Sequence, residues 1–137
     1  MRIDRVLRNA VRERAANVCE YCRLPEWLCE FRFVVDHIVA RQHRGPRELE
    51  NLALCCPFCN YHKGPNASGV LETGEVIRLF HPRTDVWSEH FYWAAGLVMP
   101  RSTVGQVTIV VLAMNHPEQV SLRTSFVREG KLRLDEE

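Results

Sequence analysis

Two pairs of cysteines form the clearest metal-binding pattern in this 137-residue chain. Within each pair two residues separate the cysteines, which are Cys19 and Cys22, then Cys56 and Cys59. This spacing lets one tight turn place both sulfurs on the same ion, and four thiolates close a tetrahedral zinc site without an open position. We therefore expect structural Zn²⁺. The alternative, a thioredoxin-like redox motif, requires a CxxC within a βαβ pattern, which this sequence lacks.

Two further cysteines, Cys29 and Cys55, are left over from the six in the chain. The N-terminal residues contain no apolar segment typical of a secretory signal, and no apolar run is long enough to cross a membrane. We therefore expect a cytoplasmic protein whose thiols stay reduced and bind metal. Cys55 adjoins Cys56 and could replace it as a zinc ligand, although its spacing to Cys59 is a looser fit.

Asp36 and His37 stand between the two cysteine pairs and could hydrolyse a phosphodiester bond. That reaction needs a base for water, neutralisation of the phosphoryl charge and help for the leaving oxygen, and one His with one divalent cation can supply all three. A neutral His is a suitable general base near pH 7. An Asp oxygen is a ligand that Mg²⁺ or Mn²⁺ prefers.

The order of these motifs resembles the HNH endonuclease family, in the branch whose ββα-metal motif is braced by two CxxC pairs. The resemblance covers residues 18–64 and rests on VCEYC, VVDHIVARQHRG and ELENLALCCPFCNYHKG. It implies that His37 is the general base and that Asn51 steadies the loop between two strands. It also implies that Asp36 and Asn60 hold a catalytic divalent cation, Mg²⁺ or Mn²⁺. The family carries His or Asn at the position of Asn60, so this chain is an HNN variant.

Basic residues flank this motif and could contact DNA. We expect phosphate contacts from residues beside the motif, namely Arg41, Arg44, Lys63 and His62. His62 could instead support a metal ligand, and His43 is an alternative base. Five more arginines lie within the first 14 residues, at positions 2, 5, 8, 12 and 14. They suit a phosphate backbone, or a solvated helix face.

Charge differs between the two halves of the chain. Residues 1–64 carry 11 Lys and Arg against 8 Asp and Glu, whereas residues 65–137 carry 7 against 9. The total of +1 therefore averages a basic half and a mildly acidic half. We predict an HNH module with an N-terminal basic helix at residues 1–64 and a C-terminal extension that packs on it at residues 65–137.

Hydrophobic periodicity predicts the elements that position these residues, in an α+β fold with a ββα-metal core and a small α+β extension. In the first half we expect a helix over 3–16, a strand over 31–35 that runs into Asp36 and His37, a loop over 41–50, a strand over 52–54 and a helix over 57–63. In the second half we expect strands over 75–80 and 87–93, a helix over 103–114 and a last helix starting at Pro117 with Val120, Phe126 and Val127 facing inward. On a regular strand, Asp36 and His37 would face opposite sides. Tyr21 and Trp27 are expected to be packing residues.

The sequence thus favours a metal-dependent HNH endonuclease that acts on DNA. The alternatives are a zinc-dependent nucleic-acid-binding module without catalysis and a regulatory zinc module that binds protein. A partner domain or protein could supply specificity. The amino-acid sequence does not determine which DNA sequence is preferred, whether one strand or both strands are cut, or the oligomeric state.

Overall fold

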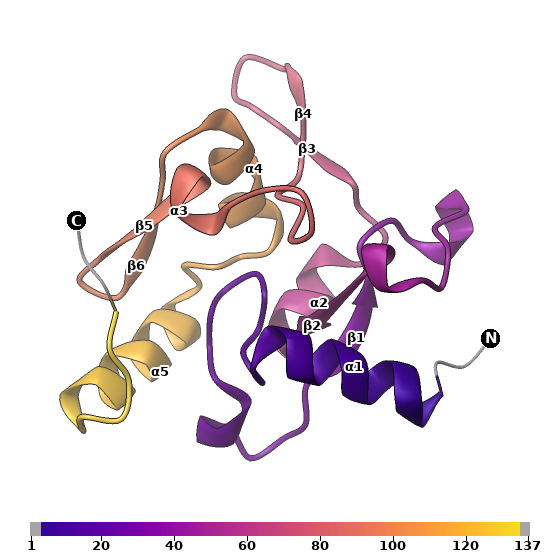
Figure 1. The fold of residues 1–137 in the computed structure, drawn as a ribbon. Helices are drawn as coiled ribbons and strands as arrows, with labels where there is room; N and C mark the ends of the chain where they lie inside the picture. Colours follow the sequence, from indigo (N-terminus) through magenta and orange to yellow (C-terminus); the bar gives the residue numbers. More distant parts are fainter. Residues whose placement is uncertain (1–3, 135–137) are drawn as a thin grey trace. The chain divides into compact units, whose positions relative to one another are not determined.

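The structure is a computed structural model that describes residues 4–134 (Figure 1). It contains two compact units. The first runs to Ala67 and includes His81–Thr84, and the second comprises Ser68–Phe80 and the chain from Asp85 onward. The chain therefore leaves the first unit, returns to it for four residues, and leaves again. No sequence pattern predicts that residues 81–84 belong to the first unit. The predicted packing of the C-terminal extension on the module stays a prediction.

The first unit is a β-hairpin followed by a short helix, preceded by a longer helix (Figure 1). Its helices and strands are α1 (Arg5–Ala15), β1 (Val34–His37), β2 (Leu52–Cys55) and α2 (Pro57–Lys63), with 3₁₀ helices η1 (Glu26–Leu28), η2 (Arg41–His43) and η3 (Leu49–Asn51) in the connections. This order gives the ββα core and the α+β class that the sequence predicts.

Helix α1 begins where a side chain caps it. The Asp4 carboxylate accepts a hydrogen bond from the Leu7 N–H at 2.8 Å, and the left-handed Ala16 ends the helix. Val11 is fully buried and anchors the helix in the core. The predicted helix is confirmed from Arg5, while Arg2 and Ile3 lie outside the described residues.

Strand β1 pairs antiparallel with β2, and Asp36 lies opposite Ala53 while His37 lies opposite Leu52. The strand starts three residues later than the predicted Phe31. The reason lies at Phe33, whose N–H donates to the Glu26 carboxylate at 2.6 Å and whose carbonyl accepts from Arg12 at 2.6 Å. Side chains thus take the backbone groups that a longer ladder would use. The return strand predicted over residues 52–54 is confirmed.

Helix α2 has the bounds that the sequence predicts. The Cys56 sulfur caps it by accepting the Cys59 N–H at 3.4 Å, and Pro57 occupies the first turn, where no N–H partner is needed. Gly64 ends it with a φ of +51°, in the region that favours glycine. One metal-site residue therefore also fixes the start of the helix.

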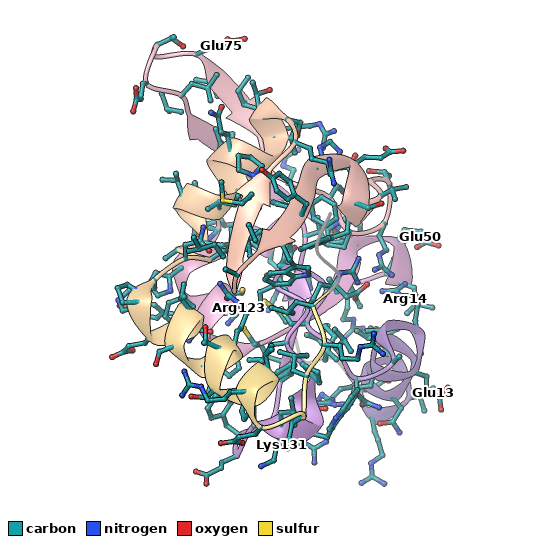
Figure 2. The ribbon with its side chains drawn as sticks, turned by 90° about the vertical axis from the view of Figure 1, so that its left-hand side faces the viewer. Glu13, Arg14, Glu50, Glu75, Arg123 and Lys131 are labelled. Carbon is teal, nitrogen blue, oxygen red and sulfur yellow. The ribbon has the colours of Figure 1, made fainter. Side chains whose placement is uncertain are left out.

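The second unit contains two hairpins and three helices within the described residues. These are β3 (Ser68–Val70), β4 (Val76–Arg78), α3 (Trp87–His90), β5 (Phe91–Ala94), β6 (Leu97–Pro100), α4 (Thr103–Val111) and α5 (Pro117–Arg128). Figure 2 shows Glu75 at the tip of the β3–β4 hairpin. The β4 strand is shorter than the predicted 75–80, and β3 and β6 have no counterpart in the prediction.

The strand predicted over residues 87–93 is wrong for its first four residues, which form α3. The Trp87 ring lies 5.0 Å from the Phe91 ring and 5.3 Å from the Trp93 ring, so the aromatic residues stack on each other across the helix–strand junction. Strand pleating accounts for the alternation only from Phe91 onward, where β5 alternates buried and half-buried residues.

The two C-terminal helices are confirmed. The Ser102 side chain caps α4 through the Gly105 N–H, and His116 caps α5 immediately before Pro117. Val127 is 42% exposed, so its predicted inward position is wrong. Among the helices of residues 4–134, none combines the length and apolar character that a membrane crossing requires.

Candidate metal centre and nuclease site

Four cysteine sulfurs converge where the turn formed by residues 19–22 meets the start of α2. The ligand atoms all lie within 4.8 Å of one another, all four residues are buried, and they are Cys19, Cys22, Cys56 and Cys59. The sulfurs of Cys22 and Cys56 are 3.8 Å apart. Zn–S bonds of about 2.3 Å in a tetrahedron place sulfurs about 3.8 Å apart, so the donor set fits zinc.

Backbone hydrogen bonds hold the first cysteine pair in its turn. The Cys19 N–H donates to the Leu24 carbonyl and the Arg23 N–H donates to the Cys19 carbonyl, each at 2.9 Å. Burial acts to raise the pKa of the Cys19 thiol, but hydrogen bonds with the neighbouring thiols outweigh it and lower this pKa well below its ordinary value. The cluster therefore already favours the thiolate form of Cys19. A bound dication would favour the thiolate form of the other three cysteines.

The two remaining cysteines lie outside this cluster. Cys29 is half-buried, its sulfur lies 3.7 Å from the Pro25 carbonyl oxygen, and burial raises its pKa to about 11. Cys55 is buried in β2, and a hydrogen bond with Cys19 together with burial raises its pKa well above the ordinary value. The geometry thus groups Cys56, and not Cys55, with the other three ligands.

His37 ends strand β1 and is half-buried. Its Nε2 atom is buried and has no hydrogen-bond partner among residues 4–134. Burial lowers the pKa of His37 below 6.5, and Arg41 and Lys63 lower it further, while Asp36 acts to raise it. The imidazole is therefore neutral at pH 7 and can accept a proton.

Asp36 lies on the opposite face of β1 and is buried. The Tyr21 hydroxyl donates to its Oδ2 at 2.8 Å, and the Lys63 ammonium lies 3.2 Å from Oδ2 and 3.4 Å from Oδ1. Burial raises the pKa of Asp36, while Lys63 and Tyr21 act to lower it. The pKa of Tyr21 is raised well above 10 by burial and by Asp36, so its hydroxyl stays protonated and donates.

This arrangement corrects two predictions. Lys63 is 1% exposed and also donates to the carbonyls of His37 and Ile38, each at 3.2 Å, so its predicted contact with DNA is wrong. The predicted pair of ligands for a catalytic Mg²⁺ or Mn²⁺, Asp36 and Asn60, does not fit the structure as it stands. A protein ammonium neutralises the carboxylate where the divalent ion would bind, and the half-buried Asn60 offers only one amide oxygen.

Asn51 closes the loop between β1 and β2 with its side chain. Its Oδ1 accepts the Val39 N–H at 2.9 Å, and its Nδ2 donates to the carbonyls of Val39 at 3.0 Å and Pro46 at 2.9 Å. Gly45 lies against the same loop, where an added Cβ would be 1.7 Å from the Val39 oxygen. The loop that follows His37 is therefore tightly packed around one buried amide, in the position that the sequence predicts.

The other residues predicted to bind DNA lie outside this buried cluster. Arg41 and Arg44 are exposed on and just after η2, as is His43. The Nδ1 of His62 lies 2.9 Å from the Phe58 carbonyl oxygen, and the His62 ring lies 4.2 Å from the Phe58 ring, centroid to centroid. His62 is thus held by its own helix, and its role in DNA binding stays a prediction.

Sequence reasoning missed the contribution of two side chains, one buried and one exposed. Tyr21 is fully buried as a packing residue should be, but its hydroxyl also donates a hydrogen bond to Asp36. Arg14 donates to the carbonyls of Leu49, at 2.8 Å, and Leu52, and Figure 2 shows it beside Glu50. Trp27, predicted to pack, is 65% exposed. The only sequence signal for Tyr21 is its place inside the first CxxC.

Comparison with known proteins finds one similarity, and it lies in this region. Residues 19–66 match the family model described as HNH endonuclease. The search of curated proteins and the search of solved structures each found no match. The matched segment contains all four clustered cysteines, the β1–β2 hairpin and α2. Residues 19–66 are therefore similar to HNH endonucleases, which suggests a function related to nucleic acid, and the four clustered cysteines of this segment could hold a structural zinc ion.

Proposed function

We propose that this protein is an HNH endonuclease that hydrolyses phosphodiester bonds in DNA, with His37 as the general base. The observation that carries the proposal is the state of His37 inside the matched segment. Its imidazole is kept neutral by burial, and its Nε2 has no partner among residues 4–134. This nitrogen is buried and unpaired among the described residues, so it can accept a proton from a water that the bound substrate brings against it.

In this mechanism His37 accepts a proton from water as the water oxygen bonds to phosphorus. The bond from phosphorus to the 3′ oxygen breaks, which leaves a 5′-phosphate and a 3′-hydroxyl that takes its proton from solvent. Asn51 fixes the backbone that follows His37, and β2 fixes the strand before it. The backbone that carries the imidazole is therefore ordered before the reaction, which lowers the conformational entropy lost on reaching the transition state.

The residues present do not fit a divalent cation at Asp36. The carboxylate that would hold it is paired with Lys63, so the positive charges near His37 in this structure belong to the protein. The Asp36–Lys63 pair instead ties the end of β1 to the end of α2, since the same ammonium donates to two carbonyls of the β1 end. It holds the strand that carries His37.

The same ion pair favours a second candidate function, a zinc-dependent module that binds nucleic acid without cutting it. A binding module needs the zinc brace and a basic surface but no cation at Asp36. The two candidates differ only in whether the bond is broken, so they are separated by a cleavage assay.

The test is incubation of purified protein with supercoiled plasmid DNA in Mg²⁺, Mn²⁺ or EDTA. We expect nicking by the wild type and a loss of at least about 100-fold in His37→Ala, which is typical of a missing general base. His43→Ala is the matched control, because His43 is exposed on η2. This variant should cut DNA like the wild type. Equal cutting by His37→Ala would refute the assignment of the base.

No cutting in any of the three conditions, with DNA binding retained, would favour the second candidate. Cutting in EDTA would show that the protein's own charges suffice. Cutting only with Mg²⁺ or Mn²⁺ would show that the reaction needs a divalent ion, which Asp36 could hold only if its pair with Lys63 opened.

A further inference from the structure

A groove of about 790 Å³ runs between α1 and the start of β1 in the first unit. Four arginines line it together with His37, and they are Arg5, Arg8, Arg12 and Arg32. We propose that this groove binds the phosphate backbone of the substrate strand and leads it to His37. The inference rests on the proposed function and adds to it the path of the DNA, which the loop residues Arg41 and Arg44 do not define.

The charge of the groove suits a polyanion. Among residues 4–134, four guanidinium groups line it and no Asp or Glu side chain does. Arg12 is paired with Glu26 at distances of 3.3 and 3.2 Å, and Arg32 also lowers the pKa of Glu26, so the four arginines together outnumber this one carboxylate. Arg5 and Arg32 are exposed and can reach phosphate oxygens in solvent. Guanidinium groups bind such oxygens with directed hydrogen bonds.

The helix spaces its arginines along one side of the groove. Arg5, Arg8 and Arg12 follow at intervals of three and four residues, which places them on the same helical face, over about 10 Å of axis. Arg32 comes from the segment just before β1, the strand that ends in His37. Basic groups therefore line the groove from two separate segments and continue to the proposed base.

Two polar atoms of this groove's side chains have no partner in residues 4–134. They are the Nη1 of Arg12 and the Nε2 of His37, and both atoms are buried. Most buried polar atoms in proteins are satisfied, so two exceptions lining one groove point to a ligand that supplies the missing groups. Both side chains line the groove although these two atoms are buried, so a rotation of each side chain would present Arg12 to a phosphate oxygen and His37 to the attacking water.

The experiment measures DNA binding, and not cleavage, in a His37→Ala background. The test variant removes three arginines of the groove, Arg5→Ala, Arg8→Ala and Arg32→Ala, and keeps Arg12 because it holds Glu26 and Phe33. The matched control removes three basic residues of the second unit, Arg128→Ala, Lys131→Ala and Arg133→Ala. Affinity is read by fluorescence anisotropy between about 50 and 200 mM salt.

Each phosphate that the protein no longer neutralises reduces the slope of log K against log salt by about 0.9. We expect the slope to fall by about 2 to 3 units in the groove variant and by less than about 1 in the control. Replacing the same three arginines by lysine should restore most of the slope, which a purely structural defect would not allow. Zinc content and circular dichroism check that each variant is folded.

An unchanged slope in the groove variant, in a protein whose wild type binds and nicks DNA, would overturn the groove while leaving the nuclease intact. A slope that falls as much in the control would do the same. A wild type that neither binds nor cuts DNA would refute the proposed function and the groove together.

Discussion

The four-cysteine cluster and Asp36 both bury negative charge in the same small module, and they balance it in different ways. The cysteines converge to within 4.8 Å, which places four sulfurs around one central point. The carboxylate of Asp36 instead meets an ammonium and a hydroxyl that the chain itself provides. One site has the geometry to take an ion from outside, and the other contains its counter-ion already.

The difference shows what a motif can establish about a metal. Ligand spacing identifies a site when the ligands converge on one another, as the cysteines do. A carboxylate in a matching motif establishes less, because a neighbouring lysine can take the position of the cation. The burial and the partners of Asp36, and not its place in the motif, decide which ion it holds.

The largest effect should follow from loss of the zinc ligands. Structural zinc contributes about 10–16 kcal/mol in zinc-finger peptides, more than a small module can lose and stay folded. We expect Cys19→Ser and Cys56→Ser to lose zinc and to unfold the first unit, and a chelator to do the same to the wild type. Elemental analysis and circular dichroism measure both effects.

Cys29→Ser is the control for these variants, because its sulfur is half-buried and lies outside the cluster. It should keep one zinc per chain and its fold. Retention of zinc by Cys19→Ser, or its loss from Cys29→Ser, would contradict the assignment of the ligands.

A smaller but still large effect is expected at Lys63. Lys63→Met leaves the buried Asp36 carboxylate without its cation, and breaking a buried pair costs about 3–5 kcal/mol. The double variant Asp36→Asn with Lys63→Met should recover most of this loss, because no charge is then left unpaired. Urea denaturation with and without Mn²⁺ measures the free energy of unfolding.

If Asp36 can bind a divalent ion once Lys63 is removed, Mn²⁺ should stabilise Lys63→Met and leave the wild type unchanged. A single variant as stable as the wild type would show that the pair contributes nothing to holding β1 against α2.

The loop after His37 should respond to Asn51→Ala by about 1–3 kcal/mol, since three backbone groups lose a buried partner. Hydrogen exchange at the Val39 amide should accelerate. Asn66→Ala is the matched control, because Asn66 is exposed just after α2 and should leave both quantities unchanged. Equal exchange in the two variants would argue against the bridging role of Asn51.

The smallest effect concerns protons on His37. Burial lowers its pKa, so an NMR titration should give a midpoint below 6.5. The unfolded chain then binds more protons than the folded one near and below pH 6.5, and the contribution of His37 to stability falls as the pH falls. A midpoint at or above 6.5 would mean that Asp36 and not burial governs the imidazole.

Local signals account for the parts of the fold that the sequence predicts correctly. The CxxC spacing, the proline that opens α2 and the glycine that ends it act within a few residues, and α2 has the predicted bounds. The prediction fails over the α3 segment because the aromatic residues of this region favour a strand, whereas β5 begins only at Phe91. Lys63 fails for another reason, since its burial depends on the meeting of α2 with β1, 27 residues away along the chain.

Because His81–Thr84 belongs to the first unit, it affects which fragment of the chain would contain the whole module. Glu20, between two zinc ligands, is buried, and its carboxylate accepts the Leu54 N–H at 2.8 Å and pairs with Arg83. A fragment trimmed to residues 19–66 would keep every clustered cysteine and His37. It would still lose Arg83, and with it the cation that Glu20 faces. The segment that sequence comparison matches is therefore shorter than the piece that could be transplanted whole.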